Sequence, residues 1–144
     1  MALSQAYTGR TSYYTRHETP KGKLALAVAY QVGEDRVLSL LDTGAECGIF
    51  PAELAAALGY GDPTQGVPTI LDTRYGRYAG HLVRIPTSIP ADEGNGIDVD
   101  LTWLVIPDWP GPPVIGWGGC LERLRFALDP TPGEECFYFG PISE

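Results

Sequence analysis

Short apolar stretches, each about the length of a β-strand, recur along the chain and are separated by turn residues. Residues 24–30 form one apolar run, a turn follows at 33–35, and residues 36–41 form a second run, which predicts a β-hairpin. The segment 97–106 alternates at first and then becomes wholly apolar, as expected for a strand that enters the core. Further strands are predicted at 69–75, 78–85, 87–89, 126–129 and 136–139.

Two short helices are expected to interrupt these strands. Residues 51–59 begin with a proline, contain several alanines and end with a glycine, which is typical of a short helix. A second short helix is predicted at 120–125. Residues 1–20 are expected to form an extended arm or a first strand, and residues 130–144 a C-terminal strand segment of the same single domain.

The composition narrows the fold class and the possible partners. With 18 glycines and 13 prolines among 144 residues, the chain favours short strands joined by tight turns, and we predict an all-β fold over residues 1–144. The net charge of −8 argues against nucleic acid as a partner, because phosphate binding requires a basic face. The N-terminus lacks the apolar segment of a signal peptide, and no apolar run has the length of a membrane span. We therefore expect a cytoplasmic protein with no membrane partner.

The cysteines and histidines do not form a pattern typical of a metal site. Cys47, Cys120 and Cys136 are odd in number and include no CxxC pair, so we expect reduced thiols rather than disulfides or a zinc site. His17 and His81 are isolated in the sequence and are expected to be structural or exposed. Neither a metal nor another cofactor is predicted.

The candidate chemistry lies directly after the 36–41 strand, where the sequence reads Asp-Thr-Gly-Ala. A carboxylate at a strand end, such as Asp42, can be fixed by backbone N–H groups. Gly44 would let the chain turn sharply and its own N–H approach closely. Two such carboxylates about 3 Å apart cannot both ionise, and they share one proton. One then acts as an acid toward a carbonyl while the other accepts a proton from an attacking water.

The segments Leu40–Ala45 and Val114–Gly116 together resemble the two signature elements of the retropepsin-like aspartic peptidases, the retroviral-type family. The first matches the hydrophobic-hydrophobic-Asp-Thr-Gly-Ala element and the second the hydrophobic-hydrophobic-Gly element that precedes a helix. The resemblance covers roughly residues 24–130. It implies a single-lobe acid-protease barrel that dimerises through a twofold axis. It also implies an aspartic endopeptidase that hydrolyses peptide or protein substrates with water, without a cofactor.

Within that resemblance, the site residues take the roles of the matching family positions. Asp42 of each chain would supply one carboxylate of the catalytic pair. The loop around it would be formed by Thr43, whose hydroxyl would interlock the two active-site loops, together with Gly44 and Ala45. Support for this loop would come from Val114, Ile115 and Gly116, and the hairpin over residues 70–81 would form a flap whose substrate-binding residues are Tyr75, Gly76, Arg77 and Tyr78.

The sequence contains a near-repeat of the motif at Asp72-Thr73, but Asp72 is not expected to be the second carboxylate. Arg74 replaces the required glycine, thirty residues are too few for a second lobe, and Asp72 begins the predicted flap hairpin. The partner of Asp42 is therefore predicted to be the same residue of a second chain, related by a twofold axis.

Some features leave alternatives open or depart from the family pattern. Asp-Thr-Gly is also good turn chemistry, and Gly76 and Gly80 also suit a plain hairpin turn. Trp117 stands where the family usually carries an arginine after the glycine, with Arg123 or Arg125 as possible replacements, and residues 135–139 could add an interface strand. The alternative function is a non-catalytic module of the same fold, for dimerisation or peptide binding.

Overall fold

A computed structural model of the chain describes residues 6–17, 24–60, 62–73 and 76–142. Within these residues the structure is built mostly of strands, which confirms the all-β prediction. The strands are β1 (Gly9–His17), β2 (Leu24–Val32), β3 (Asp35–Leu41), β4 (Gly48–Pro51), β5 (Val67–Thr73), β6 (Gly76–Ile89), β7 (Glu93–Gly94), β8 (Ile97–Ile106), β9 (Val114–Ile115), β10 (Leu124–Asp129) and β11 (Cys136–Pro141). The helical segments are α1 (Ala52–Ala57) and the 3-10 turns η1 (Pro63–Gln65) and η2 (Leu121–Arg123).

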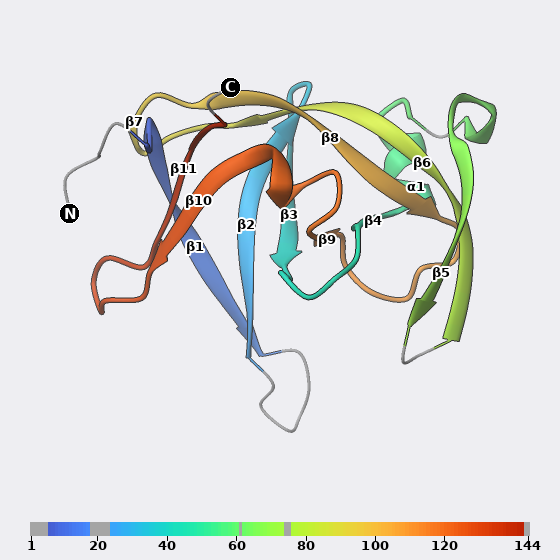
Figure 1. The fold of residues 1–144 in the computed structure, drawn as a ribbon, viewed down its shortest axis with the longest axis horizontal. Coiled ribbons are helices and arrows are strands. Elements are labelled where there is room, and N and C mark those ends of the chain that lie inside the picture. The colour runs from blue at the N-terminus through green and yellow to red at the C-terminus, as the bar shows by residue number, and fades with distance from the viewer. Residues whose placement is uncertain (1–5, 18–23, 61, 74–75, 143–144) are drawn as a thin grey trace.

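The strands form one strongly curved sheet that closes on itself. Its order is β10-β11-β1-β2-β3-β9-β4-β8-β6-β5, and β2 also pairs with β6 through Gln31 and Ser88. This extra pairing joins β2, β3, β9, β4, β8 and β6 into a ring, in agreement with the predicted barrel. Figure 1 shows the long strands β6 and β8 crossing the molecule, with β1, β10 and β11 at one end and β5 and α1 at the other.

Several predicted elements have different bounds in the structure. Residues 78–85 and 87–89 belong to one strand, β6, which already begins at Gly76, so Gly76 and Arg77 lie in the strand and not in the turn. The helix predicted at 120–125 is wrong: only Leu121–Arg123 form a 3-10 turn, and the chain then enters β10. The strand β4 was not predicted.

The C-terminal strand β11 is also placed differently from the expected interface strand at 135–139. It lies between β10 and β1 and hydrogen-bonds to both, so neither of its edges is free for another chain. Its residues Cys136–Gly140 are all buried.

The main core is centred on Trp103 of β8, which is fully buried. Its indole stacks on the ring of Tyr30 with centroids 5.5 Å apart, and Phe50 packs edge-on against it at 5.2 Å. The Tyr30 hydroxyl is hydrogen-bonded to Ser39 Oγ. A second, smaller apolar cluster consists of five buried residues on β4, β5, β8 and β9, namely Ile49, Leu71, Leu104, Ile106 and Val114. Among the described residues, no helix is long and apolar enough to cross a membrane.

Candidate active site

Asp42 follows the last residue of β3, where the chain leaves the sheet. Its backbone N–H donates to the carbonyl of Ile115 at 3.0 Å, and its own carbonyl accepts the N–H of Ala45 at 3.2 Å. The carboxylate is held as well, because the N–H of Gly44 donates to Asp42 Oδ1 at 2.9 Å. Asp42, Thr43 and Gly44 are all exposed. The sequence therefore produces a fixed, accessible carboxylate on a tight turn.

Gly44 fulfils only part of its predicted role. Its N–H does reach the carboxylate, but its φ angle is not positive, so the turn itself does not require a glycine. A Cβ at this position would lie 3.4 Å from Asp42 Oδ1, an ordinary contact distance. The glycine therefore leaves vacant a position beside Asp42 Oδ1 that an alanine methyl group would occupy.

The predicted second element lies directly beside this turn. β9 runs parallel to β3, with Val114 opposite Leu40 and Ile115 opposite Leu41. After β9, the N–H of Trp117 donates to the carbonyl of Ala45 at 2.9 Å, and the N–H of Gly118 donates to that of Glu46 at 3.0 Å. Hydrogen bonds therefore join the Asp42 turn to the second element at both of its ends.

Gly116 has a steric reason to be a glycine. A Cβ there would collide with the backbone carbonyl of Cys47 and would lie 3.0 Å from the backbone nitrogen of Gly48. The two segments can come this close only because residue 116 has no side chain.

The predicted flap is the hairpin of β5 and β6, in which Thr73 pairs with Gly76 and Asp72 with Arg77. Tyr75 lies outside the described residues. Gly76 has a φ of 134°, a backbone conformation that side chains rarely adopt. Tyr78 is half-buried and packs edge-on against Trp109, with ring centroids 5.0 Å apart.

This aromatic contact connects the hairpin to the rest of the site. Tyr78 and Trp109 both pack against the smaller apolar cluster, and so do Ala45 and Cys47 from the Asp42 turn. Trp109 is itself fixed by a hydrogen bond from Nε1 to the carbonyl of Pro112 at 3.0 Å. This contact could not be predicted from the sequence, because it joins two segments that are distant in the chain.

Asp72 lies in the hairpin, as its sequence position suggested. Its carboxylate forms an ion pair with Arg77 Nε across the two strands at 2.8 Å, and both side chains are highly exposed. The structure thus separates the two Asp-Thr dipeptides: one ends β3 beside the second element, and the other is part of a hairpin.

Trp117 does not act as a buried substitute for the arginine of the family pattern. Its side chain is 48% exposed and packs edge-on against Phe126 of β10, with centroids 6.4 Å apart. Arg123 donates a hydrogen bond from Nη1 to the backbone carbonyl of Asp100 at 2.8 Å, and its side chain therefore lies against β8.

The nearby thiols are not set up as nucleophiles. All three cysteines are unpaired. Partial burial raises the pKa of the Cys47 thiol, and the charge of Glu46 raises it further. Burial raises the pKa of Cys120 to about 12, so this thiol stays protonated near neutral pH. Among the described residues, no three His, Cys, Asp or Glu side chains gather closely enough to hold a metal ion.

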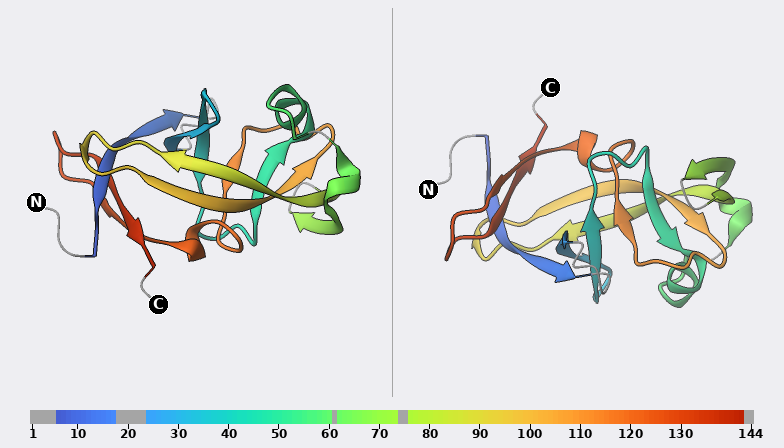
Figure 2. Two further views of the ribbon diagram at one scale, coloured as in Figure 1. Left: turned by 90° about the horizontal axis from the view of Figure 1, so that it is seen from above. Right: turned by 90° about the horizontal axis from the view of Figure 1, so that it is seen from below.

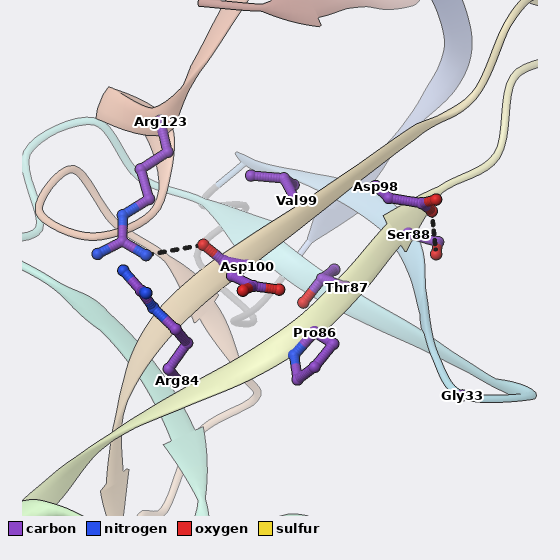
Figure 3. A pocket seen from close by; sticks show the side chains of 9 residues that line it. All are labelled: Gly33, Arg84, Pro86, Thr87, Ser88, Asp98, Val99, Asp100 and Arg123. Carbon is purple, nitrogen blue, oxygen red and sulfur yellow. Dashed lines mark hydrogen bonds between the residues drawn. The ribbon is translucent and has the colours of Figure 1, made fainter.

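A separate open groove of about 830 Å³ lies on β6 and β8, near the turn between β2 and β3 (Figure 3). Within it, Ser88 Oγ donates to Asp98 Oδ1 at 2.7 Å, and Arg123 contacts Asp100 as described above. None of the predicted site residues lines this groove. Its lining residues are Gly33, Arg84, Pro86, Thr87, Ser88, Asp98, Val99, Asp100 and Arg123.

Comparison with known proteins identifies the fold. The sequence matches no protein-family model and no curated protein. Among solved structures, it is similar to a retropepsin-like aspartic protease from Rickettsia conorii, with a TM-score of 0.55 and 18% identity over 89% of this chain and 98% of that one. It is also similar to the retroviral protease-like domain of Ddi1 from Leishmania major, with a TM-score of 0.58 and 18% identity over 83% of this chain and 94% of that one. The chain has the retropepsin-like fold.

The retropepsin-like fold spans most of this chain and nearly all of both neighbours. The fold predicted from the two short signature elements is therefore confirmed. At 18% identity the similarity concerns the fold alone. The function of this retropepsin-like chain is therefore inferred from its own residues.

Proposed function

We propose that the protein is an aspartic endopeptidase in which Asp42 supplies the catalytic carboxylate. The observation that carries this proposal is the geometry of the Asp42 turn. The carboxylate is exposed at a strand end, oriented by the Gly44 N–H at 2.9 Å, and joined by backbone hydrogen bonds to a second element. A turn aspartate with no further function would not require this second set of contacts.

The active site is proposed to form between two copies of the chain. The described residues contain one Asp-Thr-Gly turn of this geometry, whereas the chemistry requires two carboxylates. Asp72 cannot be the second, since it is paired with Arg77 in the hairpin. A twofold axis would bring together Asp42 of each copy, and Thr43 would link the two turns, as the resemblance implies.

The proposed reaction follows from two carboxylates that share one proton. Because close like charges cannot both persist, one carboxylate of the pair is neutral and the other charged. The charged member accepts a proton from water, which attacks the peptide carbonyl, while the neutral member donates its proton to the carbonyl oxygen. The pair titrates as a unit, so its apparent pKa values belong to both residues together.

The β5–β6 hairpin is proposed to cover an extended peptide substrate. Backbone pairing would provide affinity, and apolar pockets would select side chains. Tyr78 and the apolar cluster beside it offer such a surface, since Ala45 of the Asp42 turn packs against the same cluster. The preferred peptide is therefore expected to carry apolar side chains near the cleaved bond.

The test is cleavage of a mixed peptide library between pH 4 and 7, with sedimentation measured on the same samples. Asp42→Asn should lower kcat/KM by roughly a thousandfold or more, because it removes a group that transfers protons in the reaction. Asp72→Asn is the matched control and should retain full activity, because it breaks only an exposed ion pair.

The outcomes separate the candidate functions. If a dimeric sample shows no cleavage that depends on Asp42, the peptidase proposal fails. The protein is then better explained as a non-catalytic module for dimerisation or peptide binding. A monomer that cleaves peptides through Asp42 would contradict the shared carboxylate pair.

A further inference from the structure

The open groove on β6 and β8, which we call the β6–β8 groove, lies on a polar face of the sheet that has no part in the proposed active site. The residues on the exposed side of these strands form three facing pairs, Arg84 with Thr102, Pro86 with Asp100, and Ser88 with Asp98. They share one side because successive residues of a strand alternate between its two faces, and none of them is buried. The volume of about 830 Å³ is in the range of ligand sites.

Two arginines line one end of the β6–β8 groove. Arg123 donates from Nη1 to the carbonyl of Asp100 at 2.8 Å, and Arg84 stands one facing pair further along on the same side. Figure 3 shows both guanidinium groups at the end of the groove away from Ser88. Within the part of the chain that the structure describes, neither guanidinium forms an ion pair with a carboxylate. This end therefore presents positive charge that the protein leaves unpaired, on a chain with a net charge of −8.

The other end of the groove is acidic. Asp98 lies two residues before Asp100 on β8, so both side chains are on the same side of the strand, about 7 Å apart along it. Ser88 Oγ donates to Asp98 Oδ1 at 2.7 Å and orients that carboxylate. Neither aspartate is in an ion pair with another described residue. Between the facing pairs of Asp98 and Arg84 lie four residues of strand, so the two ends of opposite charge are about 13 Å apart.

We propose that the β6–β8 groove binds an extended peptide segment that carries an acidic and a basic side chain four residues apart. A peptide that lies along β6 and β8 rises by the same distance per residue as these strands, so its first and fifth side chains reach the two ends together. The acidic group pairs with Arg84 and Arg123, whose planar guanidinium groups suit a carboxylate. The basic group pairs with Asp98. Arg123 and Asp98 are already oriented by hydrogen bonds, which lowers the cost of ordering them on binding.

Other ligands fit this charge pattern less well. A purely anionic ligand that extends along the groove meets the carboxylates of Asp100 and Asp98, and a purely cationic one meets the arginines. A free amino acid carries both charges but is too short to reach both ends. An extended peptide of mixed charge is the ligand that matches the sign and the spacing together.

The groove is separate from the Asp42 turn. Gly33, in the turn between β2 and β3, borders the groove, whereas Asp42 follows the opposite end of β3. The 7 residues of β3 lie between them, a length of about 23 Å. Figure 2, in the view from above, shows β6 and β8 crossing in front of the other strands, and Figure 1 shows the loop after β3 at the far end of that strand. A peptide in the groove therefore leaves the proposed active site free.

Peptide titration followed by NMR of the isotope-labelled chain tests the inference. The mixed-charge peptide has capped ends, a glutamate at its first and a lysine at its fifth position, and glycine and serine elsewhere. In the acidic peptide glutamine replaces the lysine, in the basic peptide it replaces the glutamate, and in the uncharged peptide it replaces both. The mixed-charge peptide should bind about two- to fivefold more tightly than either singly charged one, and salt should weaken its binding. The amide signals of Arg84, Ser88 and Asp98 should shift, and those of the Asp42 turn should not.

Two substitutions assign the ends of the groove. Arg84→Gln should lower the affinity for the mixed-charge peptide about two- to fivefold without weakening the basic peptide, because Arg84 is exposed and holds no partner in the described chain. Asp98→Asn should weaken the mixed-charge and basic peptides but not the acidic one, and the asparagine can still accept the Ser88 hydrogen bond. Arg77→Gln is the matched control, since it removes the same charge outside the groove and should leave all affinities unchanged.

Several results would overturn the inference. Equal affinity for the mixed-charge and uncharged peptides would mean that the charges of the groove are not used. Tighter binding of the basic peptide would show only the general attraction of an acidic protein. Displacement of the mixed-charge peptide by an equal concentration of inorganic phosphate would indicate a plain anion site, and signal shifts confined to the Asp42 turn and the β5–β6 hairpin would place the peptide elsewhere.

The inference does not rest on the proposed function, and one further sample keeps the two apart. Asp42→Asn should bind the mixed-charge peptide as tightly as the wild type does, because Asp42 lies outside the groove. Loss of cleavage with intact groove binding would then concern Asp42 alone. Loss of groove binding in this variant would contradict the separation of the two sites.

Discussion

At the scale of single residues, the two motif glycines serve different purposes. Gly116 allows two backbone segments to come together, because a side chain there would overlap the carbonyl of Cys47. Gly44 has no such backbone neighbour, and a side chain there would contact only the Asp42 carboxylate. Substitution should therefore separate stability from activity at these two positions.

Gly116→Ala is expected to destabilise the protein by about 3 kcal/mol, because the added methyl must push apart two packed segments. For a domain of this size that loss lowers Tm by about 10 °C. Thermal unfolding followed by circular dichroism measures the change. An unchanged Tm would show that the contact between Gly116 and Cys47 is looser than the structure indicates.

Gly44→Ala should behave in the opposite way. The φ angle of Gly44 is not positive, so alanine fits the backbone and the free energy of unfolding should stay equal or rise by up to about 1 kcal/mol. Peptide cleavage should nevertheless fall, because the methyl group lies 3.4 Å from Asp42 Oδ1. Equilibrium denaturation and kcat/KM on one preparation check both parts, and a full loss of folding would contradict the expectation.

The residue scale is also where the sequence was most informative. Asp42 could be picked out because the chemistry of a strand-end carboxylate followed by a glycine is local. Gly116 was identified only through the resemblance of Val114–Gly116 to a family element, since its close approach to Cys47 joins segments that are distant in the chain. The exposure of Trp117 could not be predicted, since an indole in the sequence gives no sign of which neighbours cover it. Its contact with Phe126 depends on how β10 folds back after η2.

At the scale of elements, the β5–β6 hairpin is joined to the body of the molecule by an aromatic contact. Tyr78 meets Trp109 edge to face, and Trp109 is held by its bond to Pro112. Such a pair contributes about 0.5–1.5 kcal/mol beyond the burial of its surface. The contact thus adds to the burial of Leu71 in holding the hairpin against the apolar cluster.

Trp109→Ala is therefore expected to increase hydrogen exchange of backbone amides in β5 and in the first half of β6 by about 2- to 12-fold. Trp109→Phe is the matched control, because it removes the Nε1 hydrogen bond but keeps a ring against Tyr78. Equal exchange in the two variants would show that the hydrogen bond to Pro112, and not the ring contact, holds the hairpin.

The predicted elements succeeded where local sequence determines them. The hairpins of β2–β3 and β5–β6 follow from turn residues between apolar runs, and the pairings are between neighbours in sequence. β4 was not predicted, because it pairs with strands that are distant in the sequence, parallel with β8 and antiparallel with β9. The helix at 120–125 was wrong because Leu124 and Arg125 pair with β11, and this tertiary contact outweighs their local preference for a helix.

At the scale of the whole molecule, the described part of one chain contains one Asp42 turn and one β5–β6 hairpin that can cover it. In the proposed dimer, each of these is half of a symmetric arrangement, and a twofold axis would complete both together. Catalysis should then depend on the assembly of two intact turns, and an inactive copy should act as an inhibitor of an active one.

Mixing wild type with a ninefold excess of Asp42→Asn should therefore lower activity per wild-type chain to about one tenth, since random pairing leaves few wild-type chains with an intact partner. A dimer of one wild-type and one Asp42→Asn chain has a single catalytic carboxylate. It therefore lacks the second carboxylate that is needed for one group to act as acid and the other as base. The measurement needs an incubation long enough for the subunits to exchange, and an assay directly after mixing serves as the control. Before the subunits exchange, the wild-type dimers are intact and the activity should be unchanged. Activity that stays proportional to the amount of wild-type chain would mean that each copy works alone.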